Sequence, residues 1–338
     1  MKIKINGSYF YFFKDVSIQL NLDSVGSLFS ILARFNPDNP VHREIFRPLS
    51  YHKIEFFDDD EKLMLTGVIV NHNFTATEKP ELVKLSGYSL GGILEDISIP
   101  YSSYPLESIK RSLKDVCERL FSPFNLKLII DPSAAKEVNQ IYEKTVAKPD
   151  ESIKSYISKL TSQRNIVLSH DEYGNILMFK PTLNKKTAII FNNENTQKIS
   201  LAVNGQSMHS EISVIRQPSI SNKNISPVDT VVNSMVSQKR TLVKVLSSGS
   251  DTDTKNAANN TLSSELKNIS IGVELDRVVG INPGDVVEVE SKNAYLYTRI
   301  KFMVSAVNYK LNESVSNTSI SLVLPETYTG DLPKNIFK

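Results

Sequence analysis

Residues 271–290 read Ile-Gly-Val-Glu-Leu-Asp-Arg-Val-Val-Gly-Ile-Asn-Pro-Gly-Asp-Val-Val-Glu-Val-Glu. Ile271, Val273 and Leu275 alternate with polar or small residues, the period of two that turns one face of a β-strand towards a core. Asn282-Pro283-Gly284-Asp285 suits a type II turn, because proline fixes φ at its second position and glycine accepts positive φ at its third. Further strand-like runs from Tyr295 to Leu311 and from Ser319 to Leu324 extend the pattern. The stretch predicts an antiparallel meander.

The first 98 residues have the same period of two. Runs from Tyr51 to Phe57 and from Leu63 to His72 flank the acidic segment Asp58-Asp59-Asp60-Glu61, and a further strand begins at Leu82. Between the early strands, the segment from Asn36 to Ser50 contains three prolines, which exclude a central strand or a helix interior. We therefore expect a long excursion there, and it is the candidate interface loop.

The middle of the chain, residues 99–182, has a mixed pattern. Apolar residues from Leu106 to Phe121 recur at helical spacing, which predicts one amphipathic helix ending before Pro123. A strand follows from Leu126 to Ile130, and a second helix is predicted to start near Asp150, whose carboxylate would cap it. Strand-like runs on both sides of His170–Gly174 predict a hairpin. This part is expected to be a small α+β unit.

A chain of 338 residues exceeds the size at which one hydrophobic core stops growing, so several domains are expected. The fold class predicted is mainly β with an α+β insertion. We expect an antiparallel β-barrel over residues 1–98, the α+β domain over 99–182, a second β-barrel over 183–327 with one helix near 253–266, and a C-terminal extension over 328–338.

Composition excludes several classes of protein. Lys plus Arg total 39 and Asp plus Glu 37, and the net charge of +2 gives no overall basic field for nucleic acid or an anionic membrane. The single cysteine, Cys117, excludes an intrachain disulfide. Since the sequence offers neither a signal peptide nor a membrane-spanning run, we expect no membrane insertion and synthesis in the cytoplasm.

The most suggestive catalytic motif is Gly87-Tyr88-Ser89-Leu90-Gly91, which matches the nucleophile elbow of serine hydrolases. An esterase would need Ser89 on a strand-to-helix turn, with His170 or His209 as its base. That elbow belongs to mostly parallel α/β sheets, whereas an antiparallel meander precedes this one. An ordinary turn at a barrel edge is the favoured interpretation, and a serine esterase is the less favoured alternative.

The sequence gives no support for a cofactor or metal site. The acidic segment 58–61 lacks the ligand spacing of a calcium loop, and the five histidines never fall at metal-pair spacing. Phosphate-binding glycine motifs are also missing. We expect no catalytic residues, no cofactor and no metal. A monomeric surface- or carbohydrate-binding β-protein remains an alternative, although the absence of Trp argues against a sugar platform.

The order of these elements resembles the baseplate hub proteins of contractile phage tails, in the Mu-like tail protein group that includes the late-control tail proteins of P2-like phages. The resemblance covers most of the chain as short landmarks. They are Phe57 to Val70 with Thr66-Gly67-Val68-Ile69, Val83 to Asp96, the helix from Leu106 before Leu126-Lys127-Leu128, Glu151 to Phe179, Asn282-Pro283-Gly284-Asp285-Val286, Val304 to Val307, and Thr318 to Pro325 followed by Glu326-Thr327-Tyr328.

The resemblance implies a non-enzymatic homotrimer. Each chain would carry two β-barrels similar to the tail-tube fold, so that three chains present six and adapt the sixfold tail tube to the threefold central spike. The other partners implied are the tail tube protein, baseplate wedge proteins and the C-terminus of the tape measure protein. DNA would pass through the lumen without specific binding.

Because the sequence stops soon after the last meander without a spike-like module, we expect the central spike to be a separate chain. The location implied is the baseplate of a virion tail, or of a tailocin, assembled in the cytoplasm of the host bacterium.

Overall fold

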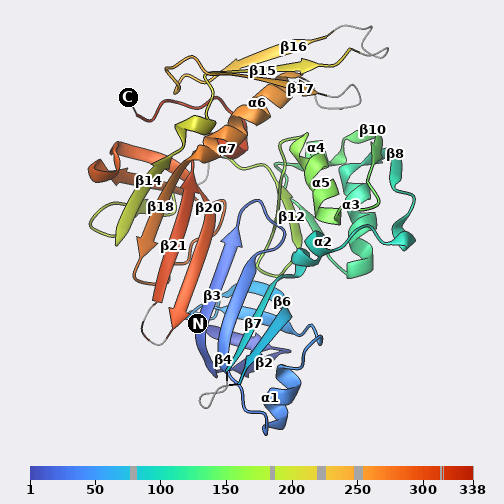
Figure 1. Ribbon diagram of the computed structural model, residues 1–338, viewed down its shortest axis with the longest axis vertical. Coiled ribbons are helices and arrows are strands. Elements are labelled where there is room, and N and C mark those ends of the chain that lie inside the picture. The colour runs from blue at the N-terminus through green and yellow to red at the C-terminus, as the bar shows by residue number, and fades with distance from the viewer. Residues whose placement is uncertain are drawn as a thin grey trace.

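The computed structural model describes residues 1–76, 82–182, 187–218, 226–246, 254–312, 314 and 316–337. Most strands belong to one 13-stranded sheet, and Figure 1 shows its N-terminal strands in blue beside its C-terminal strands in orange and red. The strands of this sheet are β1 (Lys2–Ile5), β2 (Ser8–Phe10), β3 (Phe13–Asn21), β4 (Leu28–Arg34), β5 (Lys53–Phe57), β6 (Leu63–Thr75), β7 (Leu82–Ser89), β13 (Ile190–Phe191), β14 (Lys198–Val203), β18 (Ile269–Leu275), β19 (Val286–Ser291), β20 (Leu296–Asn312) and β21 (Ser316–Val323).

The sheet contains one strand order twice. We call β3-β4-β7-β6-β5 repeat A and β14-β18-β21-β20-β19 repeat B, each written in spatial order. In both, the first two strands in the chain are neighbours, the last strand lies beside the second, and all pairings are antiparallel. Both also contain a one-residue bulge at the corresponding position, Val70 in β6 and Ser305 in β20. The two repeats therefore share one topology.

One hydrophobic core serves both repeats. Alternate residues of β3 and β18, such as Ile18 and Val273, are fully buried, as the period of two predicts. These residues belong to a single cluster that runs from Ile3 in β1 to Leu324 after β21. The sequence-based prediction of a mainly β chain with antiparallel strands is confirmed.

The α+β part lies beside repeat A and is drawn in green in Figure 1. It contains α2 (Ile93–Asp96), β8 (Glu107–Ser112), α3 (Leu113–Phe121), β9 (Leu128–Ile130), α4 (Ala135–Asn139), β10 (Ile141–Val146), α5 (Ile153–Ser162), β11 (Val167–His170) and β12 (Ile176–Phe179). β8 pairs with β10, and β12 lies between β11 and β9. The predicted hairpin at His170–Gly174 is confirmed by the antiparallel β11–β12 pair.

Two predicted helix starts in this part are wrong. The apolar stripe from Leu106 begins as strand β8, and the helix starts only after Ser112, whose side chain and that of Asp115 form a capping box. The second helix is capped by Ser152, which accepts a hydrogen bond from Ser155 N, and not by Asp150. In both places a serine cap two or more residues further on fixes the helix start.

The excursion at residues 36–50 contains a short helix, α1 (Pro40–Ile45), with Asn39 as its cap and Pro40 in its first turn, where proline is tolerated. Phe46, which follows the helix, is buried and packs edge-on against Phe10. The excursion is thus anchored to the common core through Phe46.

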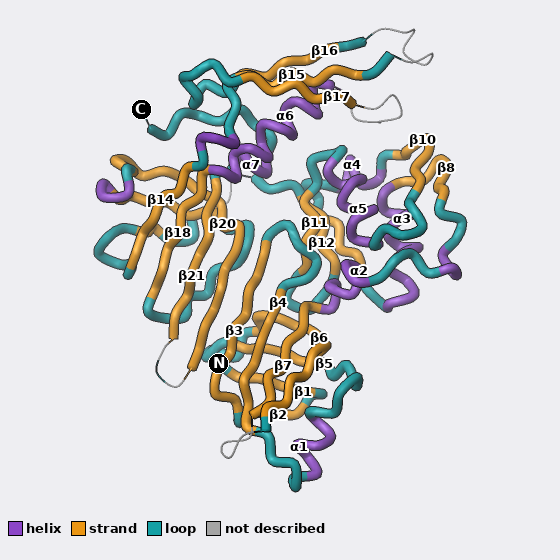
Figure 2. Tube along the Cα trace, in the orientation of Figure 1, coloured by secondary structure: helices purple, strands orange, loops and turns teal. Residues whose placement is uncertain are grey.

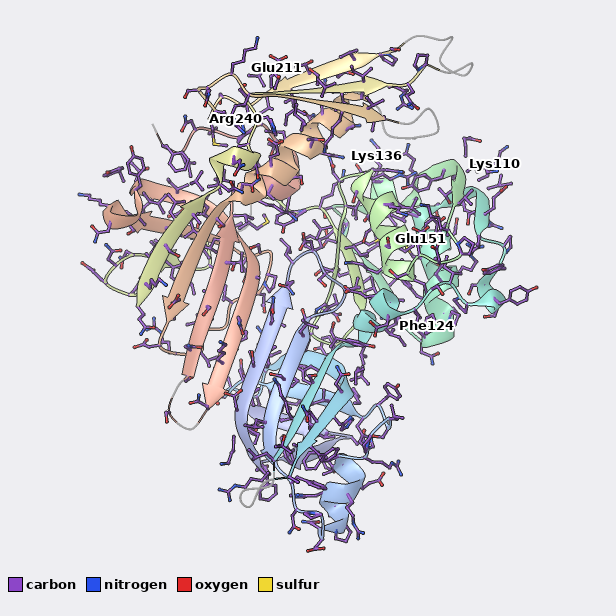
Figure 3. All side chains as sticks on the ribbon, viewed as in Figure 1. Lys110, Phe124, Lys136, Glu151, Glu211 and Arg240 are labelled. Atoms are coloured by element: carbon purple, nitrogen blue, oxygen red, sulfur yellow. The ribbon has the colours of Figure 1, made fainter. Side chains whose placement is uncertain are left out.

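A small sheet is inserted between β14 and β18. It consists of β15 (Glu211–Arg216) between β16 (Val228–Val232) and β17 (Thr241–Leu246), and α6 (Thr254–Glu265) packs on one face, as Figure 2 shows. Arg240, labelled in Figure 3, fastens this insertion by donating to Met208 O at 3.0 Å and Gln206 O at 2.7 Å. The predicted helix near 253–266 is α6, although residue 253 lies outside the described residues. Helix α7 (Glu326–Thr329) follows the last strand.

The domain division at residues 98, 182 and 327 remains a prediction, and its third unit begins at residue 183, outside the described residues. Within the described ranges, no helix is both long enough and apolar enough to cross a membrane.

The turn at residues 282–285 generates a stability prediction. Gly284 has φ +88°, and a Cβ there would lie 3.1 Å from Leu22 Cδ1. We expect Gly284→Val to lower the free energy of unfolding by about 1–3 kcal/mol, because a branched residue is strained at positive φ. Thermal and urea unfolding would measure it. Gly280→Val, in the same loop with open space where a Cβ would lie, is the matched control, and equal losses from both would contradict the turn geometry.

Candidate functional site

Ser89, the serine of the elbow-like motif, is fully buried and lies at the end of β7. Its Oγ donates to Val25 O at 2.9 Å and accepts from Ser27 N at 3.0 Å, while its own N donates to Ser27 O at 2.8 Å. A hydroxyl committed in this way cannot present itself to an ester. Its role is to tie the end of β7 to the β3–β4 connection.

His170 bonds to Ser27 and not to Ser89. Its Nδ1 donates to Asp171 O at 2.8 Å, so Nε2 carries the lone pair that accepts from Ser27 Oγ at 2.7 Å. Burial lowers the pKa of His170, which favours the neutral ring. The contact joins the hairpin of the α+β part to repeat A, beside a cavity of about 340 Å³ also lined by Asp131, Lys180 and Pro283.

The remaining sequence candidates have structural partners. His209 Nδ1 lies 2.7 Å from Glu265 Oε1 in the small insertion. In the acidic segment, Asp59 pairs with the N-terminal amino group, Glu61 with Lys2, and Asp58 Oδ1 accepts from Lys62 N at 2.8 Å. No group of three or more metal-ligating side chains occurs among the described residues.

The contact that joins the two repeats is the β20–β3 pair. It is antiparallel from Ala306↔Asn21 to Asn312↔Asp15, and the two strands are separated by nearly the whole chain. Tyr309, opposite Ile18, is buried, and its hydroxyl hydrogen is shared between Ile281 O at 2.9 Å and Val279 O at 3.0 Å. Burial raises the pKa of Tyr309 to about 12.

Each repeat also has one edge that no described strand covers. In repeat A, β6 pairs with β5 only as far as Val68, so residues 71–75 are unpaired on that side, and Phe74 is 40% exposed. In repeat B, β14 pairs only with β18 among the described strands. Uncovered strands of this kind offer hydrogen-bonding groups to another chain. Sequence reasoning missed both edges, because which strand ends a sheet depends on pairings far apart in the chain.

No protein family model and no curated protein matches the sequence. Solved structures do match. A 43 kDa tail protein of prophage MuSo2 from Shewanella oneidensis superposes with a TM-score of 0.81 at 15% identity, covering 97% of this chain and 99% of that chain. A tail protein from Neisseria meningitidis MC58 gives a TM-score of 0.79 at 15% identity, covering 98% of each chain.

The chain has the fold of phage tail proteins. A third match is a component of the type VI secretion system of E. coli, described as structurally similar to two tail proteins of bacteriophage T4, with a TM-score of 0.63 at 11% identity over 99% of this chain and 80% of that chain. The fold class expected from the resemblance is therefore confirmed over almost the full length.

Ser89→Ala tests the structural role of the serine. Removing the hydroxyl leaves Ser27 N without its acceptor in a buried place, so we expect a loss of about 1–3 kcal/mol in unfolding free energy and no change in the background hydrolysis of a nitrophenyl ester. Ser86→Ala, on the same strand, is the control. Ester turnover that the wild type shows and the Ser89 variant lacks would contradict the assignment.

The His170 contact predicts a pH dependence. Because the folded state holds its pKa below 6.5, the unfolded state binds the proton more readily, and stability falls as pH drops below about 6.5. We expect melting temperatures measured from pH 7.5 to 5.5 to decline less steeply in His170→Gln. Some slope should remain, since burial also lowers the pKa of His72. An unchanged slope would contradict the role of His170.

Proposed function

We propose that the chain is the structural baseplate hub of a contractile phage tail or tailocin, a homotrimer without enzymatic activity. The observation that carries the proposal is the repeated strand order within a tail-protein fold. Two repeats related head-to-tail in one chain let three chains supply six similar units. Such head-to-tail contacts close into a ring when the rotation per repeat is 60°.

This arrangement suits a symmetry adaptor. Six repeats would face the sixfold tail tube, while the parts that occur once per chain would give the threefold match needed by a central spike. Baseplate wedge proteins would contact the rim, and the C-terminus of the tape measure protein would reach the lumen. The net charge of +2 favours a lumen that lets DNA pass without holding it.

The surface-binding alternative draws on one observation. Tyr9 in the edge strand β2 and Tyr11 just after it are exposed and stack with ring centroids 5.9 Å apart, an arrangement suited to a glycan. A monomeric protein that binds glycans would support it. The esterase alternative loses its support, because the Ser89 hydroxyl is committed to Val25 and Ser27.

Light scattering behind size exclusion, over a wide concentration range, tests the hub. We expect a species of about 114 kDa, three copies of the 37.9 kDa chain, and ring-shaped particles with pseudo-sixfold symmetry in negative stain. A 37.9 kDa monomer up to the highest concentration, without rings, would contradict the proposal and favour the surface-binding alternative.

A further inference from the structure

The two repeats can be aligned residue by residue from their bulges. Val70 and Ser305 are the extra residues, so Asn71 corresponds to Ala306, His72 to Val307 and Phe74 to Tyr309. A second hydrogen bond supports this alignment. Ile69 N donates to His52 O at 3.0 Å in repeat A, and the corresponding Val304 N donates to Asp285 O at 2.9 Å in repeat B.

The same alignment continues across each sheet to its first strand. In repeat A, Asn71 faces Ser86, which faces Ser30, which faces Ser17 of β3. In repeat B, Ala306 faces Ser321, which faces Gly272, which faces Ser200 of β14. Ser200 of β14 therefore corresponds to Ser17 of β3, and Leu201 corresponds to Ile18.

The residues that meet inside the chain are more buried than their counterparts on the uncovered strands. Tyr309 and Ile18, which face each other inside the chain, are 2% and 0% exposed. Their counterparts Phe74 and Leu201 are exposed and half-buried, respectively. The β20–β3 contact is thus made within the chain, while the equivalent segments, residues 71–75 of β6 and strand β14, each have one side that no described strand covers.

Resting on the proposed ring, we propose that β6 of one copy pairs antiparallel with β14 of the next copy in the register of the β20–β3 contact. Phe74 then faces Leu201, His72 faces Val203 and Ala76 faces Ile199, as Tyr309, Val307 and Leu311 face their partners on β3. On the other face of the sheet, Asn73 lies opposite Ala202. A second copy of this chain is the occupant of both edges.

The chemistry of the two edges fits such a seam. Residues 71–76 read Asn-His-Asn-Phe-Thr-Ala and residues 199–204 read Ile-Ser-Leu-Ala-Val-Asn, without Lys, Arg, Asp, Glu or Pro. Open edges in monomeric proteins are usually protected by charges, proline or bulges that prevent pairing. Burying Phe74 against Leu201 would also continue the apolar core from one copy to the next. The excursion at residues 36–50 would flank the seam, since Phe74 packs against Phe35 at its start.

Paired cysteines test the register. Directly opposite residues in antiparallel strands have Cβ atoms about 4.5–5.5 Å apart, so a disulfide forms after an approach of about 1 Å, while neighbours slipped by one residue point to opposite faces. In the full chain we would combine Phe74→Cys with Leu201→Cys and Asn73→Cys with Ala202→Cys, then oxidise with copper phenanthroline. Recombining the same substitutions as Phe74→Cys with Ala202→Cys and Asn73→Cys with Leu201→Cys gives the slipped controls. The native Cys117 is buried and stays in place.

We expect covalent dimers and trimers on non-reducing gels from the in-register pairs, at least tenfold above the slipped pairs. Mixing the Phe74→Cys chain with the Leu201→Cys chain should give dimers, and neither alone should. Equal yield from the slipped pairs would overturn the register. A trimer by light scattering that fails to cross-link at any pair would overturn the seam while leaving the hub intact, and a monomer without cross-links would overturn both.

A charge substitution gives an independent readout without relying on disulfide geometry. Phe74→Asp removes the ring contact with Phe35 and should lower the melting temperature of the monomer by only a few degrees, while it lowers the trimer fraction at least tenfold. Val243→Asp, on an exposed position of β17, is the matched control and should leave the trimer intact. Trimers that persist in the Phe74 variant would overturn the proposed seam.

Discussion

The β20–β3 pair is the contact on which the architecture depends. It joins a strand near the start of the chain to one near its end, and through it two similar sheets become one sheet with a common core. Closing a loop of this length carries an entropic cost, and the buried side chains of this long strand pair help to offset it. Within this pair, Tyr309 packs opposite Ile18, and its hydroxyl donates a hydrogen bond to the segment that precedes β19.

Local patterns predicted the parts of the fold that local physics determines. Alternation at Ile271, Val273 and Leu275 gave a strand with those side chains buried, and the proline-glycine pair at 283–284 gave a turn with positive φ at glycine. The sequence pattern predicts too early a start for the helix after Ser112, because the apolar residues of strand β8 extend the stripe backwards at helical spacing. The strand period and the helix period overlap in this stretch, and only the serine cap marks where the helix begins.

The site could be predicted only in part, because contacts between distant segments of the chain decide it. Ser89 matches a catalytic motif in five consecutive residues, yet its neighbours Val25 and Ser27 come from another hairpin and decide that its hydroxyl is structural. The duplication is equally hidden in the sequence. Ser30 corresponds to Gly272 and Phe74 to Tyr309, so the two repeats share strand order and bulge position more than residue identity. Sheet edges follow from pairings, and pairings are not local.

The two repeats carry different additions at one end of their strands. Repeat A continues from β7 into the α+β part, whereas repeat B opens between β14 and β18 to admit the small sheet and α6. At the opposite end, repeat A carries the excursion at residues 36–50 with α1, whereas no helix lies among the described residues between β18 and β19 of repeat B. In the proposed ring the two kinds of repeat alternate, so a partner touching either end would meet each kind three times. The additions thereby reduce a sixfold arrangement of similar sheets to threefold symmetry.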